Sequence, residues 1–248
     1  MVASPVTITV TALSTVMASQ NIGEPPLVIR PNPVWNDPDG DRVAEAAAWT
    51  ELREIDWVDR RGRLDGQALD SLHVLAHPTI EYTAVFTADG RPYHVIVAGR
   101  GDDMVMAYRE GQAVTLTLAQ RQSLPETLLR QIPDARPAPI DSLNLRLSEL
   151  PGIRSELDLP GARSSLGAGD ARLLGLLIKR RLVGQGELYV SVRDHYGRRR
   201  VSPPIRYQDY KPGRVVVVLA GGFLSVAPAT KKLLLDRLHQ AQQAFTDT

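Results

Sequence analysis

Apolar and polar residues alternate along several short stretches of the chain, and this two-residue period predicts β-strands. The clearest stretch runs from Ile80 to Thr87, where every second residue is apolar or aromatic. Asp89 and Gly90 follow, a pair that favours a tight hairpin turn. Residues 215–219 are apolar on both faces, which predicts a strand at the centre of a sheet. Other strands are expected at residues 93–98, 104–109, 113–118, 140–147 and 187–193.

Apolar residues recur every three or four positions elsewhere, which predicts helices. Asp41 and Asp65 are expected to cap two of these helices, and Pro78 to end the second. Ser123 and Glu126 have the spacing of a capping box. The expected helices cover residues 41–55, 65–77, 124–132, 170–182 and 228–245. Two further stretches are expected at residues 8–19, a helix or a strand leading into one, and 27–30, extended.

The same order of elements occurs twice along the chain. The matching positions are Asp65 and Asp170, Leu72 and Leu177 (both 105 apart), Glu81 and Glu187 (106), Gly90 and Gly197 (107), and Ala119 and Ala227 (108). An offset that changes so little predicts a duplicated scaffold with an approximate two-fold axis. We therefore expect a single domain, 1–248, made of two similar halves, 1–135 and 136–248.

Composition limits the classes of function that fit the chain. The 248 residues are 43% hydrophobic and 23% charged, with a net charge of +1, which is ordinary for a soluble globular protein. No stretch of about 18 apolar residues occurs, so no membrane-spanning helix is expected. The first residues lack a basic leader ahead of their apolar stretch, which is atypical of a secretory signal. We expect a cytoplasmic protein that does not bind membranes.

Residues that commonly carry catalysis or bind metals do not cluster in this sequence. There is no cysteine, which excludes disulfides, thiolate nucleophiles and cysteine-based metal sites. Among the histidines, His73 and His77 come closest to a metal-ligand spacing, but no glutamate follows His73 and Pro78 ends the helix. We therefore expect no catalytic residues, no metal and no cofactor, and a protein that works by binding.

Two other classes of function remain open from the residues alone. Residues 170–214 hold eleven Lys and Arg against four acids, so the segment 172–214 could bind nucleic acid. Its charges alternate with core-type residues, which favours the solvated face of a helix and two hairpin strands instead. An enzyme whose site is assembled from dispersed polar residues is the third class.

Several segments of the chain resemble the EspG proteins, the cytosolic chaperones associated with ESX (type VII) secretion. The first is Gly-Glu-Pro-Pro-Leu-Val at 23–28. The second is the Leu-Asp-Gly-x-x-Leu pattern at 64–69, whose helix ends in Leu-Ala-His-Pro at 75–78 before the strand 80–87. The third is Gly-Gly-Phe-Leu-Ser-Val-Ala-Pro at 221–228, leading into the final helix.

The resemblance implies both a fold and a function. The implied fold class is α+β, a pseudo-two-fold symmetric, central and mostly antiparallel β-sheet flanked by helical bundles. The implied function is to bind the tip of the PPE subunit in a PE–PPE-like heterodimer, to keep that dimer soluble and to direct it to one secretion system. The family picture contains no catalysis, no cofactor and no nucleic acid.

The turn from Thr87 to Pro92 corresponds to a partner-contacting loop of the family, and in this chain it is short. A second contact region is expected around Phe223 and the last helix; Val217 and Leu219 lie in the same region but fit the core better. The residues expected to contact the partner are Thr87, Asp89, Gly90, Arg91, Phe223 and Ser225. The hairpin edges would also allow a weak homodimer.

Overall fold

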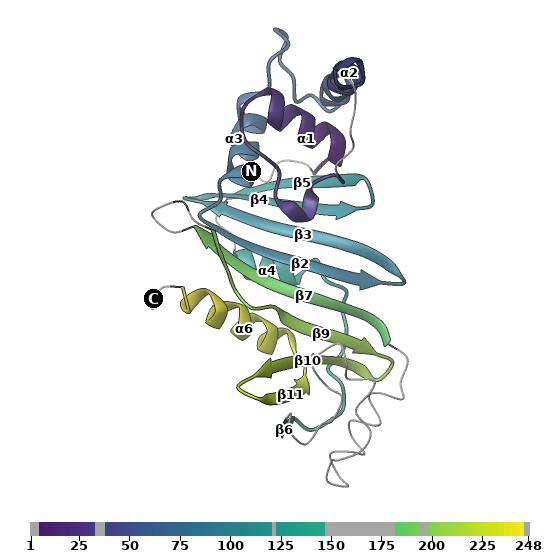
Figure 1. The fold of residues 1–248 in the computed structure, drawn as a ribbon, viewed down its shortest axis with the longest axis vertical. Helices are drawn as coiled ribbons and strands as arrows, with labels where there is room; N and C mark the ends of the chain where they lie inside the picture. Colours follow the sequence, from purple (N-terminus) through teal and green to yellow (C-terminus); the bar gives the residue numbers. More distant parts are fainter. Residues whose placement is uncertain are drawn as a thin grey trace.

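The computed structural model describes residues 5–32, 38–120, 123–146, 182–193, 197 and 199–245. These residues form an elongated α+β fold built on a large sheet, with helices on both of its faces (Figure 1). Every pair of neighbouring strands in the sheet is antiparallel. The expected α+β class with a large antiparallel sheet is confirmed.

The described part of the sheet contains eleven strands. They are β1 (Val6–Thr9), β2 (Ile80–Ala88), β3 (Arg91–Arg100), β4 (Asp103–Glu110), β5 (Ala113–Gln120), β6 (Leu143–Arg146), β7 (Leu182–Arg193), β8 (Arg199–Val201), β9 (Ile205–Tyr210), β10 (Gly213–Ala220) and β11 (Phe223–Pro228). The helices are α1 (Val10–Ser19), η1 (Leu27–Ile29), α2 (Pro38–Glu54), α3 (Gly66–Ala76), α4 (Leu124–Leu129) and α6 (Lys231–Gln243).

The strands follow in equivalent order on the two sides of the central β2–β7 pair. On one side lie β3, β4, β5 and β1, and on the other lie β9, β10, β11 and β6, with β8 also paired to β7. The strand that precedes each half in the sequence, β1 or β6, is thus the outermost strand of that half. This order is what a two-fold axis between β2 and β7 requires. The superposition of complete halves stays a prediction, because Asp170 and the helix expected after it lie outside the described residues.

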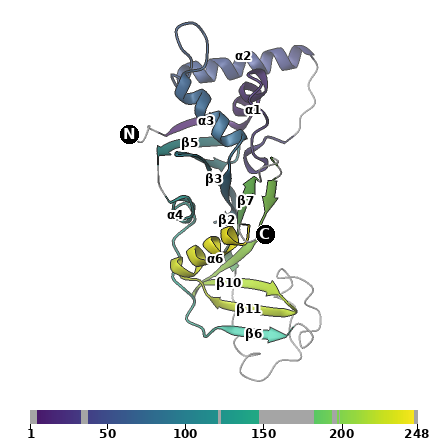
Figure 2. The same cartoon turned by 90° about the vertical axis from the view of Figure 1, so that its left-hand side faces the viewer.

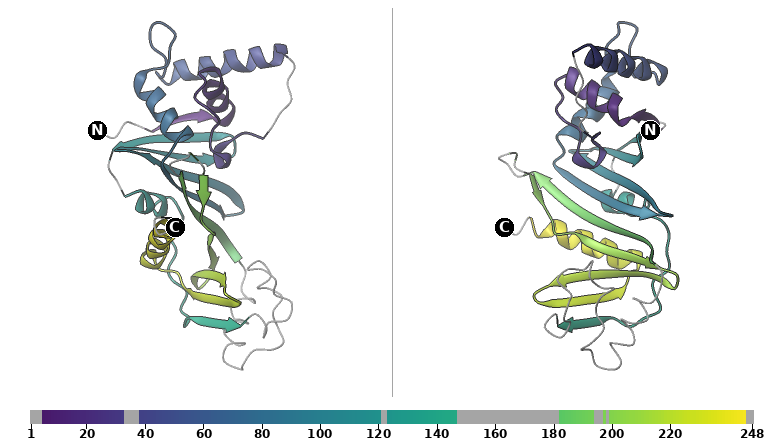
Figure 3. Two further views of the ribbon diagram at one scale, coloured as in Figure 1. Left: turned by 60° about the vertical axis from the view of Figure 1, so that its left-hand side comes forward. Right: turned by 45° about the vertical axis from the view of Figure 1, so that its right-hand side comes forward.

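Because side chains alternate along a strand, the sheet has two distinct faces. On one face, Tyr82, Ala84 and Phe86 of β2 join a core that includes Leu128 of α4 and Leu238 of α6. We call this the helix-pair face, because α4 and α6 pack on it and on each other (Figure 2). Both views in Figure 3 show α6 lying along β7 and β9.

The opposite face, which carries Glu81, Thr83, Val85 and Thr87 of β2, is here called the groove face. At one end of it, α3 packs on β3 and β4 and α1 joins the same core, with Leu13 and Leu72 among the buried residues. At the other end lies a second apolar cluster: Leu143, Leu145, Val215, Val217, Leu224 and Val226. The two clusters leave the central strands between them. Helix α2 packs on α1 and lies farthest from the sheet (Figure 2).

Helix starts show where local sequence signals were sufficient. Asp65 caps α3 as predicted, with its side chain accepting hydrogen bonds from the backbone N–H groups of Gln67 and Ala68. The prediction of Asp41 as a cap is wrong, because α2 already begins at Pro38, a residue that suits a first helical turn. The Ser123 capping box is also wrong, because the Ser123 side chain makes no capping hydrogen bond.

Three other predictions need correction. Leu27–Ile29 is a 3-10 helix instead of an extended segment, closed by a 3.0 Å hydrogen bond from the Ile29 N–H to the Pro26 carbonyl. Helix α4 ends at Leu129, earlier than expected. Strand β10 is buried on both faces but lies third from the β6 edge, because apolar clusters cover both its faces away from the centre. The expected helix 170–182 lies outside the described residues except for Leu182, which belongs to β7.

Candidate partner-binding groove

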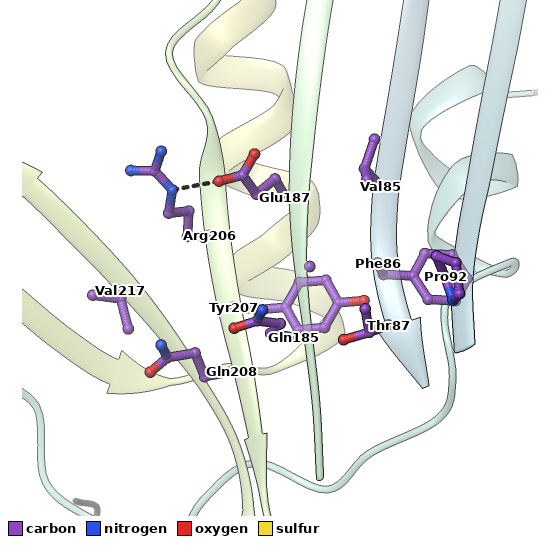
Figure 4. A pocket seen from close by; sticks show the side chains of 11 residues that line it. Val85, Phe86, Thr87, Pro92, Gln185, Glu187, Arg206, Tyr207, Gln208 and Val217 are labelled. Atoms are coloured by element: carbon purple, nitrogen blue, oxygen red, sulfur yellow. Dashed lines mark hydrogen bonds and ion pairs between the residues drawn. The ribbon is translucent and has the colours of Figure 1, made fainter. Parts of the chain in front are cut away.

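A shallow groove of about 180 Å³ crosses the middle of the groove face, between the two apolar clusters. Its walls come from β2, β3, β7, β9 and β10, so both halves of the chain contribute to it (Figure 4). The residues that line it are Val85, Phe86, Thr87, Pro92, Gln185, Gly186, Glu187, Arg206, Tyr207, Gln208 and Val217. The lining mixes apolar side chains with uncharged amides and one pair of opposite charges.

The pairing register explains why these residues meet. Val85 pairs with Glu187, Glu187 with Arg206, and Arg206 with Val217. The four side chains therefore form one row across four strands, with a charged pair between two valines. On the far side of Val85 the row continues to His94 of β3. Burial, together with the charge of Arg109 on β4, holds the pKa of His94 below its ordinary value.

In the groove, Glu187 accepts hydrogen bonds from two neighbouring side chains. Its Oε1 accepts a hydrogen bond of 2.7 Å from the Arg206 Nε, and its Oε2 accepts one from the Tyr189 hydroxyl. Burial and the neighbouring Glu187 raise the pKa of Tyr189 to about 12, so this hydroxyl stays protonated and able to donate. About a third of each charged side chain remains exposed: 34% for Glu187 and 28% for Arg206. The pair therefore meets solvent in the groove.

Gly186 gives the groove its shape on the other side of β7. A side-chain carbon at this position would lie 2.5 Å from the Cζ atom of Tyr207. The missing side chain lets the Tyr207 ring cross β7, where Tyr207 is 1% exposed and joins the core under α4 and α6. Gly186 thus leaves room for the Tyr207 ring on the helix-pair face.

The β2–β3 turn projects from the end of the strands that carry Thr87 and Pro92. Asp89 and Gly90 have φ values of 51° and 77°, both in the left-handed region that a two-residue hairpin turn requires. The flanking residues Ala88 and Arg91 pair with each other, which confirms the predicted turn. Asp89, Gly90 and Arg91 are all exposed, and Arg91 forms an ion pair of 3.4 Å with Glu110 on β4. The turn is therefore accessible to a partner.

The residues predicted to contact a partner fall in two places. Thr87 lines the groove, and Asp89, Gly90 and Arg91 form the turn beside it. Phe223 and Ser225 lie on β11, where they alternate with Leu224 and Val226 of the groove-face cluster, so they point to the opposite face. There the Arg146 guanidinium lies 6.0 Å from the centre of the Phe223 ring, and the Ser225 hydroxyl bonds to Asn144. The structure does not bring these two groups together.

The sequence analysis did not single out Glu187, Arg206, Gln185 or Gln208 as site residues. Glu187 and Arg206 lie beside apolar residues of their strands, and Gln185 and Gln208 lie two positions from them on the same side; this pattern marks the polar side of a strand but does not tell which strand lies beside it. The β2–β7 and β7–β9 registers bring them to one groove. Val217, which the sequence placed in the core, is 1% exposed and also forms part of the groove wall.

The described arginines of the basic segment 172–214 have partners within the chain. Arg199 bonds to Glu81, Arg206 to Glu187, and Arg214 to Asp209. Arg193 donates to the carbonyl oxygens of Ala76 and Gly197, and the Arg200 guanidinium lies 5.2 Å from the centre of the Phe245 ring. Nucleic-acid binding of this kind depends on cations that meet successive phosphates. Internal pairing of these arginines therefore disfavours the nucleic-acid alternative.

Within the described ranges, no group of three His, Cys, Asp or Glu residues is placed to hold a metal ion. The absence of a cofactor and of catalysis stays a prediction. None of the described helices combines the length and the apolar character needed to cross a bilayer.

The described residues form an α+β scaffold with an open groove across the middle of its antiparallel sheet. The profile of the EspG family matches residues 9–240, and the chain belongs to the EspG family. A solved structure of the Mycobacterium tuberculosis type VII secretion system chaperone EspG5, in complex with a PE25–PPE41 dimer, has the same fold. The match has a TM-score of 0.69 at 18% sequence identity and covers 96% of each chain. No curated protein matches the chain.

Proposed function

We propose that this protein is a cytoplasmic, non-catalytic chaperone of type VII secretion that binds the helical tip of a PE–PPE-like heterodimer. In this role it keeps the dimer soluble and directs it to its secretion system. The observation that carries the proposal is membership of the EspG family over residues 9–240. The EspG5 structure, solved with a PE–PPE dimer, supports the same reading because its fold extends over nearly the whole chain.

The groove face supplies a physical basis for this function. An apolar helical tip aggregates unless it is covered. A preformed sheet surface bordered by packed helices loses little conformational freedom when it binds, which favours affinity. The groove presents Val85 and Pro92 for apolar contact and Gln185 and Gln208 for hydrogen bonds. A partner lying over the groove and the β2–β3 turn would contact both halves of the scaffold.

Co-expression tests the proposal directly. The chain is produced with PE–PPE pairs encoded in the same genome, and complexes are isolated by size-exclusion chromatography. We expect a soluble 1:1:1 complex with at least one pair that is insoluble or aggregated alone. Absence of a soluble complex with every pair tested would contradict the proposed function.

A matched pair of variants then locates the docking face. Thr87→Arg places a long charged side chain at the groove wall, and we expect it to abolish the complex. Thr117→Arg makes the same change at a half-buried position of β5 whose register assigns it to the helix-pair face. We expect that control variant to keep the complex. Equal loss in both variants would place the partner elsewhere.

A further inference from the structure

We propose that the Glu187–Arg206 ion pair is a specificity determinant, which selects a client tip that donates a hydrogen bond to Glu187 from a polar side chain flanked by apolar ones. This inference rests on the proposed function, because the tip of a PE–PPE-like dimer is the occupant of the groove. The pair is the charged part of a lining that otherwise consists of apolar and uncharged residues.

The position of the pair ensures that an occupant of the groove covers it. Val85 is the cross-strand neighbour of Glu187, and Val217 is the cross-strand neighbour of Arg206. Val85 is half-buried and faces the groove, whereas Val217 is buried, so an occupant in apolar contact with Val85 lies beside Glu187 and the Arg206 bonded to it (Figure 4). Both charged side chains are partly exposed, so solvent reaches them in the free protein. A bound tip removes that solvent.

The hydrogen bonds of Glu187 define which chemical group must replace the solvent. A carboxylate offers about four acceptor positions. Among the described residues, two are used, one by the Arg206 Nε and one by the Tyr189 hydroxyl. Since the remaining capacity of Glu187 is for accepting only, the matching group on the client is a donor: a hydroxyl, a side-chain amide or a cation.

Partial burial of the pair creates selectivity against other tips. An ion pair that is covered without new hydrogen bonds loses hydration and gains little in return. A tip that is apolar throughout would therefore bind less well than one that brings a donor. A hydrogen bond to a charged group corresponds to a difference in affinity of about 10- to 100-fold. The pair thus lowers the affinity for tips without a donor and raises the affinity for tips that bring one.

The pair is not needed to hold its two strands together. Backbone pairing joins β7 to β9 from Leu182–Tyr210 to Leu188–Ile205. A partly exposed cross-strand ion pair contributes little to stability by itself. Replacing both charges with apolar side chains of similar length is therefore expected to leave the fold intact, which allows binding to be measured.

The experiment compares the wild-type chain with the double variant Glu187→Leu/Arg206→Met. The probes are a PE–PPE dimer that binds the wild-type chain and a series of the same dimer in which polar residues of the tip are replaced one at a time (Thr→Val, Asn→Leu, Gln→Met, Lys→Met). We expect one replacement to weaken binding to the wild-type chain by about 10-fold or more. The double variant should bind that dimer and its parent within about 3-fold of each other.

Arg42→Met/Asp39→Leu is the matched control, because it removes an exposed ion pair of 3.4 Å on α2, the helix farthest from the sheet. We expect the control to discriminate between the tips as the wild-type chain does, with unchanged melting of all variants. Equal discrimination by the groove variant and the wild-type chain would overturn the inference while leaving the proposed function intact. Failure of every PE–PPE dimer to bind the wild-type chain would overturn both.

Discussion

Thr83 of β2 pairs with Tyr189 of β7, and these two residues are 106 positions apart in the sequence. The same offset separates Glu81 from Glu187, so Thr83 pairs with its own counterpart in the second half. Two residues before Thr83, Glu81 pairs with Ser191, and two residues after it, Val85 pairs with Glu187. Because Glu81 and Glu187, and likewise Val85 and Ser191, are 106 positions apart, a two-fold axis through the Thr83–Tyr189 pair would exchange these two pairs. The register places the predicted axis at this one position in the sheet.

The two counterpart glutamates nevertheless have different surroundings. The Glu81 side chain is 5% exposed and is held by Arg199 from β8. The space beside it, lined by Pro78, Ser191 and Arg199, has no room for a water molecule. Glu187 instead faces a groove of about 180 Å³. Arg199 thus fills the space beside Glu81, whereas the space beside Glu187 stays open. Of the two counterpart positions, only the one at Glu187 has room for a partner.

The β2–β3 turn gives the first prediction. Asp89→Lys should weaken binding of a PE–PPE dimer by about 2- to 5-fold, the effect of an exposed charge at the rim of an interface. The variant should still fold, because Asp89 is exposed. Titration calorimetry together with a melting curve measures both properties.

Asp89→Asn is the control for that experiment, because asparagine also tolerates the left-handed backbone at this position. If both variants bind as the wild-type chain does and melt normally, the turn lies outside the interface.

The buried ion pair on the helix-pair face gives the second prediction. Asp209 accepts two hydrogen bonds from Arg214, of 2.6 and 2.8 Å, and Arg214 also donates to the Pro133 carbonyl. Because Arg214 is 4% exposed, Asp209→Asn leaves a buried charge without its counter-ion. Denaturant unfolding should show a loss of about 3–5 kcal/mol.

Asp236→Asn removes the acid of an exposed pair on α6 and should cost less than about 1 kcal/mol. The double variant Asp209→Leu/Arg214→Met should recover much of the loss, since neither charge then remains buried. No difference between the buried and exposed variants would show that the pair contributes little.

Gly186 gives the third prediction. In Gly186→Ala the new methyl group meets the Tyr207 ring, and this overpacking should cost about 1–3 kcal/mol in the free energy of unfolding. Gly66→Ala, at the first position of α3 with open space around it, should be neutral or stabilise by up to about 1 kcal/mol. A second substitution, Tyr207→Leu, should lessen the penalty at Gly186. Additive losses in that double variant would show that the clash is not the cause.

His94 gives the fourth prediction, a dependence of stability on pH. Burial, followed by the charge of Arg109, lowers the pKa of His94, so the folded protein binds this proton less readily than the unfolded chain. The unfolded chain then gains protons as the pH falls below about 6.5, and stability decreases from that value downward. Urea midpoints measured above and below that pH should fall less in His94→Gln than in the wild-type chain. His239→Gln, at an exposed position of α6, serves as the control. Identical pH profiles in all three proteins would exclude His94 as the cause.

Much of the architecture could be predicted from the sequence, because local signals specify local structure. The alternation from Ile80 to Thr87 marked β2, the left-handed preference of Asp89 and Gly90 marked its turn, and Asp65 capped α3 through its own side chain. The repeat and the EspG patterns extended these signals to the α+β class. Errors arose at two helix starts next to a proline: α2 begins at Pro38, ahead of Asp41, and the Ser123 side chain makes no capping hydrogen bond at the start of α4.

The tertiary structure alone decided which of these elements meet. Strands β2 and β7 are about a hundred residues apart in sequence, and a pattern of period two is the same in every register that keeps the same face. Only the actual pairing places Val85 beside Glu187 and Arg206 beside Val217, and turns Phe223 and Ser225 to the opposite face. The sequence therefore determined the strands and their polar sides, whereas backbone pairing across the sheet decided which polar sides form the groove.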